Sequence, residues 1–164
     1  MQTVAYNRER AAAYAKAWAL RRNPAYYDFS GIGGDCTNYA SQCLFAGSGQ
    51  MNFTPVFGWY YLSANERTAS WTGVQFFYDF LTGNEGLGPF ATEAERSALE
   101  IGDFVQLGRE DGGFYHTPVV TGFKGNMPLV SAHSYNAYNR PLDSYAYARI
   151  RYLHIACVRI PDGA

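Results

Sequence analysis

The sequence predicts an α+β fold in which N-terminal helices pack on a C-terminal antiparallel sheet. Apolar residues recur at helical spacing in the first part of the chain, and short β-branched and aromatic segments follow after residue 99. With 164 residues, 48% of them hydrophobic, the chain is long and apolar enough to bury one core. This order of elements, without repeats or linkers, favours a single domain over residues 1–164.

The first predicted helix runs from Asn7 to Arg22. Its apolar residues recur every three or four positions, its charged residues lie mostly on the other side, and Asn23-Pro24 ends it. The pattern is that of an amphipathic helix and not of a signal peptide.

Two further helices and one helical turn are predicted before the sheet. The second helix covers residues 37–46, with Asp35 as its N-cap and Gly47 as its C-terminal stop. A third helix is predicted over residues 72–81, and a helical turn over residues 93–99.

Four segments with strand character predict an antiparallel meander. The turn Lys124–Asn126 joins two of them as a hairpin, and Pro118 limits its own strand to an edge or a bulge. The predicted strands lie within residues 100–108, 116–123, 127–134 and 150–160.

The composition excludes several classes of function. A net charge of −1 does not favour nucleic acid or an anionic membrane surface as a partner, and no apolar run is long enough to span a membrane. Three cysteines are an odd number and make no disulfide framework. Because no Cys-x-x-Cys or His-x-x-x-His spacing occurs, we expect neither a metal nor a cofactor.

Cys36 is the candidate nucleophile. It follows Gly33-Gly34-Asp35 at the start of a predicted helix, where free backbone N–H groups and the helix dipole favour a thiolate. Cys43 and Cys157 fit the pattern of small buried hydrophobic residues.

A cysteine nucleophile needs a base, and three histidines are available. His154 lies inside an apolar strand and is expected to be a hydrogen-bonded core or edge residue and not the base. His116 and His133 flank a predicted hairpin, so with matching parity they would share a face of the sheet. One imidazole could then take the thiol proton while the other, or a nearby amide, orients it.

Aromatic residues cluster between the second and third predicted helices. Trp59, Tyr60, Tyr61 and Trp71 can line a groove for a peptide or sugar, or they can pack beneath a long loop. The sequence leaves both alternatives open.

Several motifs, taken in order, resemble the bacterial putative amidase domain family. They include "GDCTNYASQCLFAG" from Gly34, "SWTG" from Ser70, and "AHSYNAYNRPL" from Ala132. The resemblance extends from Tyr6 to about Ile155, and its most specific part is Asp-Cys-Thr-Asn-x-x-Ser-Gln, residues 35–42. That family is related to papain-like NlpC-type and CHAP amidohydrolases and peptidases.

The resemblance implies a papain-like fold with the nucleophile at a helix N-terminus and the histidine on the sheet. Cys36 would be the nucleophile and His116 the general base, with His133 as the first choice and Asn136 as the second for the third catalytic residue. The backbone N–H of Cys36 would contribute to the oxyanion hole, with Tyr27 near it.

The implied function is a cysteine-dependent amidohydrolase or peptidase that cleaves cell-wall or other short peptides through a thioester. Its relatives favour a secreted or cell-wall-associated protein, and the oligomeric state stays open. The alternative is a catalytically silent module on the same fold that binds a wall glycan or peptide. Acyl transfer to an amine remains a third possibility.

Overall fold

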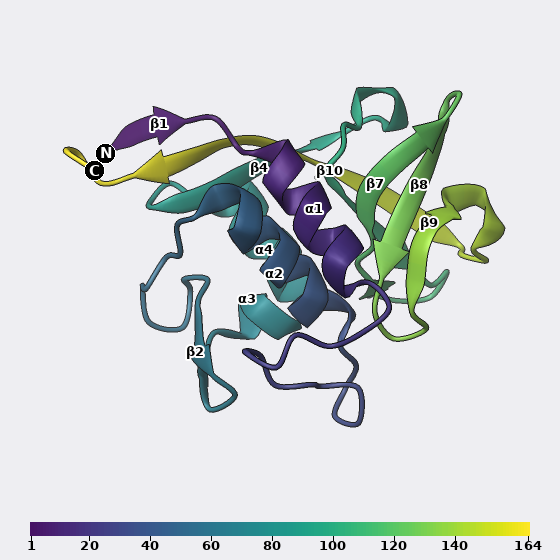
Figure 1. Cartoon of the computed structure of the whole chain (residues 1–164), viewed down its shortest axis with the longest axis horizontal. Coiled ribbons are helices and arrows are strands. Elements are labelled where there is room, and N and C mark those ends of the chain that lie inside the picture. The colour runs from purple at the N-terminus through teal and green to yellow at the C-terminus, as the bar shows by residue number, and fades with distance from the viewer.

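The computed structural model describes all 164 residues, as four α-helices and ten β-strands. Figure 1 shows the helices gathered on one side of a long, curled antiparallel sheet, with both chain termini at one end of it. The α+β class is therefore confirmed.

The three predicted helices form with shifted ends, and a short helix over Ala69–Thr72 forms in addition to them. Two short 3-10 helices cover Arg96–Ala98 and Leu142–Ser144. The α-helices are α1 (Arg8–Trp18), α2 (Cys36–Ser48), α3 (Ala69–Thr72) and α4 (Val74–Gly83).

The main sheet has eight strands, and β2 and β3 form a separate hairpin. Its order is β1-β10-β5-β7-β8-β9, with β4 also paired to β10 and β6 to β5. The strands are β1 (Gln2–Val4), β2 (Tyr61–Ser63), β3 (Glu66–Arg67), β4 (Gly88–Ala94), β5 (Phe104–Gly108), β6 (Phe114–His116), β7 (Val119–Lys124), β8 (Met127–Ala132), β9 (Ala137–Pro141) and β10 (Arg149–Ile160).

The prediction of a helical turn over residues 93–99 is wrong in part. Residues 93 and 94 complete β4, and only Arg96–Ala98 are helical. Pairing along β10 outweighs the local helical pattern here, because β4 aligns with β10 from Gly88↔Arg159 to Ala94↔Tyr152.

The sheet separates two apolar cores. Val119 of β7 belongs to the large core under the helices, whereas Val120 belongs to a smaller core on the other face. Side chains alternate along each strand, so these two valines identify the faces to which the neighbouring residues point. Pro118 lies between β6 and β7, where its missing N–H costs no ladder bond.

Gly47 does not end α2, contrary to the prediction, but lets α1 approach it closely. The helix continues to Ser48 and ends at Gly49, whose φ of 65° is left-handed. The Gly47 carbonyl accepts a hydrogen bond from the backbone N–H of Asn7 at 2.9 Å. A Cβ at Gly47 would lie 2.4 Å from the ring of Tyr6 and 2.7 Å from the Asn7 carbonyl oxygen.

We expect Gly47→Ala to lower the free energy of unfolding by about 2 kcal/mol, because the added methyl group overpacks the α1–α2 contact. Urea denaturation with global fitting measures the change. Gly83→Ala is the matched control, because a Cβ there meets nothing within 4 Å, and it should leave stability unchanged or slightly raised. Equal stability of the two variants would contradict this account of the packing.

Candidate functional site

Cys36 is the first residue of α2, and its side chain is buried, 8% exposed. The sulfur lies 3.9 Å from the backbone oxygen of Tyr115, to which the thiol donates, and 3.7 Å from the hydroxyl oxygen of Thr37. The first N–H groups of a helix have no partner within it, so Cys36 lies where backbone donors are free. The sulfur thus lies at a helix N-terminus and against β6.

β6 presents its outer edge to this sulfur. Val105 donates to the Pro118 carbonyl, and Leu107 pairs with His116, so the backbone groups of His116 point toward β5. Those of Tyr115 and Thr117 therefore point away from β5, toward α2. The Thr117 hydroxyl also meets that of Thr37 at 3.1 Å. Cys36 and Thr37 consequently lie alongside the residues that flank His116 on both sides.

The His116 ring points to the sheet face opposite the helices. It shares the alternation of Leu107 and Val120, and its centroid lies 5.8 Å from that of Tyr145, beside the smaller core. Burial, reinforced by the positive charge of Arg140, lowers the pKa of His116 to about 4. The ring makes no hydrogen bond within the chain, to Cys36 or to any other residue. Its nitrogens are therefore available to a reaction.

Burial also shifts the pKa of the Cys36 thiol. It raises the pKa of Cys36, and the negative charge of Asp35 acts in the same direction. Hydrogen bonds from the Thr37 hydroxyl and from the backbones of Thr117 and Thr37 oppose this shift. At neutral pH the resting pair is consequently a neutral thiol and a neutral imidazole, not a thiolate–imidazolium ion pair.

The structure does not bring His133 and His116 together, and the predicted shared face is wrong. Ser131 pairs with Val119, so His133 points toward the helices while His116 points away. Nδ1 of His133 lies 2.6 Å from a carboxylate oxygen of Asp35, and Nε2 lies 2.7 Å from the Trp18 carbonyl. Both nitrogens are occupied, so His133 cannot orient His116 as predicted.

Asn136, the second choice for that role, is engaged elsewhere. Its side-chain oxygen accepts from the guanidinium of Arg22 at 3.0 Å. His154 hydrogen-bonds to Asp103 at 2.9 Å, so His116 is the one histidine without a hydrogen-bond partner.

Asp35 occupies the N-cap position but does not cap the helix with its side chain, which corrects the predicted role. Its carboxylate is 1% exposed and accepts instead from the Phe29 N–H at 2.8 Å and the Asn38 side-chain amide at 2.9 Å. His133 supplies the third hydrogen bond. Asp35 therefore ties the preceding loop, α2 and the end of β8 together beside Cys36.

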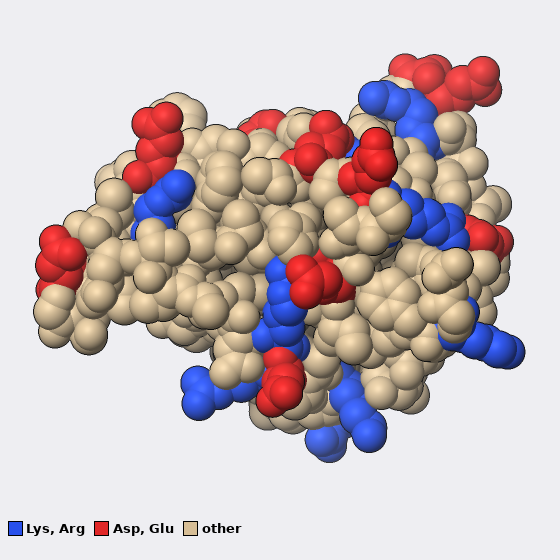
Figure 2. All heavy atoms as spheres, turned by 90° about the horizontal axis from the view of Figure 1, so that it is seen from above, with Lys and Arg blue, Asp and Glu red and all other residues tan.

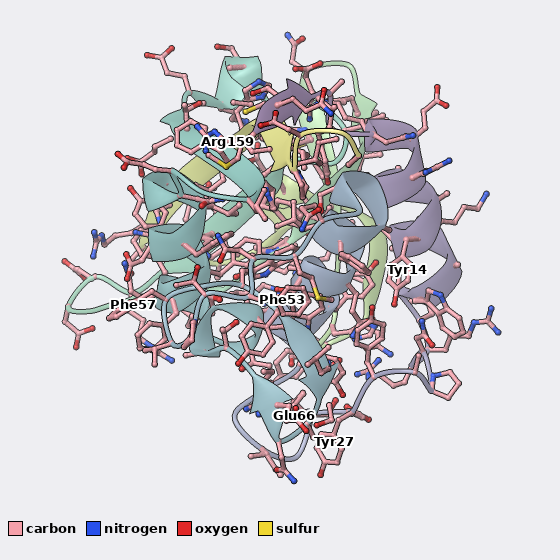
Figure 3. All side chains as sticks on the ribbon, turned by 90° about the vertical axis from the view of Figure 1, so that its left-hand side faces the viewer. Tyr14, Tyr27, Phe53, Phe57, Glu66 and Arg159 are labelled. Carbon is pink, nitrogen blue, oxygen red and sulfur yellow. The ribbon has the colours of Figure 1, made fainter.

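The predicted aromatic groove is largely core. Trp59 and Trp71 are fully buried and stack at 4.8 Å, so neither can line an open groove. Tyr60 is half-buried and packs against Phe53. Tyr27 is 46% exposed and lies at the lower end of Figure 3, and its hydroxyl makes no hydrogen bond within the chain. Its role near an oxyanion stays a prediction.

Two of the hollows on the surface bear on the site. One, of about 420 Å³, adjoins the loop before Cys36 and is lined by Arg22, Ser30, Gly34, Ser134 and Tyr135. The other, of about 540 Å³, is lined partly by Val56, Phe57, Phe76, Phe80, Asp79 and Glu85. Phe57 is 84% exposed and projects at the edge of the view in Figure 3.

The surface charges and the helices add three observations. On the face in Figure 2, basic and acidic side chains are interspersed over a larger uncharged area. No group of three or more His, Cys, Asp or Glu side chains is arranged to hold a metal ion. None of the four helices has the length and apolar character needed to cross a membrane.

A set of hydrogen-bonded polar side chains next to Cys36 was not predicted from the sequence. Thr37 contacts Thr117, whose hydroxyl accepts from Gln106 at 3.2 Å, and Gln106 in turn accepts from Arg151. Only Thr37 could have been found from the sequence, because it follows Cys36 in the motif. The others come from β5, from the segment that follows β6 and from β10, and their juxtaposition depends on strand register.

Comparison with known proteins gives two matches. The family described as the putative amidase domain matches residues 5–156. The uncharacterized protein YhbB of Bacillus subtilis (strain 168) is 38% identical over 162 residues, covering 92% of this chain and 50% of that protein. The chain thus spans about half the length of this curated relative. No solved structure matches significantly.

We expect Asp35→Asn to lower the free energy of unfolding by about 3 kcal/mol, because it leaves His133 without its buried anionic partner. Thermal unfolding followed by circular dichroism measures the loss. Asp28→Asn is the control, because that side chain is 49% exposed and pairs with Arg22, which also lies 3.5 Å from Asp35, and it should cost less than about 1 kcal/mol. Similar losses of unfolding free energy in both variants would argue against Asp35 as the buried group that joins these elements.

Proposed function

Because the chain belongs to the putative amidase domain family, we propose that it hydrolyses amide bonds with Cys36 as nucleophile and His116 as general base. The family supports amidase-type hydrolysis, and the choice of residues follows from the site. The observation that carries it is the position of the Cys36 sulfur at a helix N-terminus, against the strand residues on either side of His116.

His116 fits the role of base better than the other histidines. Its nitrogens are unpaired, its low pKa keeps it neutral over the physiological range, and it lies on the strand that Cys36 contacts. In the proposed complex, the ring turns about its side-chain bonds to bring a nitrogen to the sulfur. Catalytic hydrogen bonds often form only when the substrate is bound, so their absence from the free enzyme does not exclude them.

In the proposed acylation, the Cys36 sulfur attacks the amide carbonyl carbon while its proton passes to His116. The carbonyl oxygen becomes an oxyanion, which the backbone N–H of Cys36 stabilises, with the free Tyr27 hydroxyl as a candidate second donor. His116 returns the proton to the amide nitrogen, the C–N bond breaks, and the amine leaves. The acyl group remains on Cys36 as a thioester.

Water completes the cycle. His116 removes a proton from the water, the resulting hydroxide attacks the thioester, and the C–S bond breaks. The acid is released, and the proton on His116 returns to the sulfur. An amine in place of water would give acyl transfer by the same steps.

The proposed substrate is a peptide, with cell-wall stem or cross-bridge peptide as the first candidate and other short peptides as the second. The hollow beside Gly34 supports this class of substrate, because it adjoins the loop that leads into Cys36 and carries hydroxyl and guanidinium groups. Such groups can hydrogen-bond to peptide carbonyl and carboxylate oxygens.

A second candidate function is binding without catalysis. The observation that favours it is the larger hollow, whose volume and exposed phenylalanines are typical of a ligand site. It is lined by none of the residues that contact Cys36. A wall peptide with apolar and basic groups would complement its phenylalanines and its two carboxylates.

We expect Cys36→Ala to abolish hydrolysis, because no other thiol adjoins the site. Mass spectrometry of products from a muropeptide mixture and a general peptide library measures it. Cys157→Ala is the control, because that partly exposed cysteine lies on β10, and it should retain full activity. Full activity in Cys36→Ala would contradict the assignment of Cys36 as the nucleophile. Retention of both Cys36→Ala and wild type on insoluble cell wall, with no product from either, would favour the binding module.

The rate should depend on pH through His116. A general base must be neutral, so kcat/KM should stay level through neutral pH and fall as the pH drops through about 4. Because the pKa of the Cys36 thiol is raised, the alkaline limb should begin above the ordinary thiol range. A pH–rate profile measures both limbs, on a substrate identified by the mass spectrometry of muropeptides and peptides. An acidic limb centred near the ordinary histidine value of about 6.5 would contradict a buried base.

A further inference from the structure

A continuous chain of hydrogen bonds leads from Arg151 of β10 to the sulfur of Cys36. Arg151 Nε and Nη2 lie 2.9 and 2.7 Å from Gln106 Oε1. Gln106 Nε2 lies 3.2 Å from Thr117 Oγ1, which lies 3.1 Å from Thr37 Oγ1. Thr37 Oγ1 lies 3.7 Å from the sulfur. The chain runs from β10 through β5 and the segment that follows β6 to α2, and it ends at the proposed nucleophile.

Arg151 fixes the orientation of the Gln106 amide in this chain. A guanidinium has donors and no acceptors, so the Gln106 atom that it meets must be the amide oxygen. The Gln106 nitrogen must then point the other way, where it donates to the Val74 carbonyl at 2.9 Å and to Thr117. The orientation of a buried amide therefore follows from the chemistry of its partners.

The two hydroxyl groups can continue this direction, because each can accept one hydrogen bond and donate another. Thr117 accepts from Gln106, so its own proton is free to be donated to Thr37. Thr37 then accepts from Thr117 and can direct its proton at the sulfur of Cys36. Gln106, Thr117 and Thr37 are fully buried, where hydrogen bonds in series polarise one another and water does not compete.

We propose that this one-way chain, here called the Arg151 relay, stabilises the thiolate of Cys36 and aims the sulfur at its substrate. Its members are positioning residues, because only Thr37 touches the sulfur and none meets a reacting carbon. No proton leaves its atom, since each donor keeps its hydrogen and strengthens the next bond. The catalytic meaning of the relay rests on the proposed function, whereas its effect on the thiol does not.

The relay offsets the free-energy cost of placing a negative charge on the Cys36 sulfur. Burial of Cys36 and the adjacent carboxylate of Asp35 both disfavour a negative sulfur. His116 lies on the strand that Cys36 contacts, and it is neutral near pH 7. A hydrogen bond directed at the sulfur favours the charged form, because an anion accepts more strongly than a thiol.

The test is the pH dependence of Cys36 alkylation by iodoacetamide, followed by peptide mass spectrometry on the full chain. In Thr37→Val, which keeps the side-chain shape but loses the hydroxyl, we expect the alkylation rate of Cys36 near neutral pH to fall about tenfold. Thr37→Ser, which restores the donor, should recover most of the rate. Cys157 in the same samples is the internal control and should react equally in all variants.

A second variant acts at the far end of the relay. Arg151→Met keeps an unbranched apolar stem but removes the donors that orient Gln106. We expect a several-fold fall in the Cys36 alkylation rate, with unchanged alkylation of Cys157. This result supports the relay even if Thr37→Val does not fold.

The outcomes separate the relay from the proposed function. Unchanged Cys36 alkylation in a folded Thr37→Val, or in Arg151→Met if Thr37→Val does not fold, overturns the relay, whether or not Cys36→Ala abolishes hydrolysis. Slower alkylation in both, without hydrolysis by wild type, upholds the relay and rejects the amidase. Faster alkylation in either variant also overturns the relay, because it would mean that the chain only shields the sulfur.

Discussion

The geometry around Cys36 depends on the buried carboxylate of Asp35. This group is 1% exposed, and it can remain charged there only because several donors surround it. Those donors come from Phe29, Asn38 and His133, that is, from the incoming loop, from α2 and from the end of β8. One carboxylate thus fixes the start of α2 relative to the sheet, and with it the position of the sulfur.

His133 and His116 have different roles in this arrangement: His133 stabilises the fold, and His116 is the proposed base. His133 serves Asp35, donates to the Trp18 carbonyl at the end of α1, and stacks on Tyr39 of α2 at 4.1 Å. It therefore joins three elements, and its ring has no free nitrogen. His116 lies on the opposite face of the sheet with both nitrogens free. A side chain that is fully hydrogen-bonded holds the fold well, whereas a base needs an unpaired nitrogen.

The sequence was sufficient for the three longer helices and for strands within the four segments after residue 99, but not for β4 or for what depends on register. Helical periodicity located α1 and α4, and the turn at Lys124–Asn126 was confirmed because Lys124 pairs with Met127 across it. The parity of His116 and His133 could not be obtained in the same way, since a shift of one residue reverses the face. Trp59 and Trp71 were ambiguous for another reason: aromatic rings serve equally in grooves and in cores, and only burial distinguishes them.

A neutral pair of Cys36 thiol and His116 imidazole is compatible with a buried cysteine nucleophile. In such a pair the proton is transferred only when the substrate is bound. Burial raises the pKa of Cys36 and lowers that of His116, so forming the ion pair costs free energy in the free protein. The proton then needs to move only as the sulfur attacks, when charge passes to the carbonyl oxygen and the helix N-terminus can stabilise it. Charge is thereby created where backbone donors already point, and it is absent when no substrate is bound. In the same site, a donor fixed on the sulfur by Thr37 lowers the cost of that step without requiring a permanent thiolate.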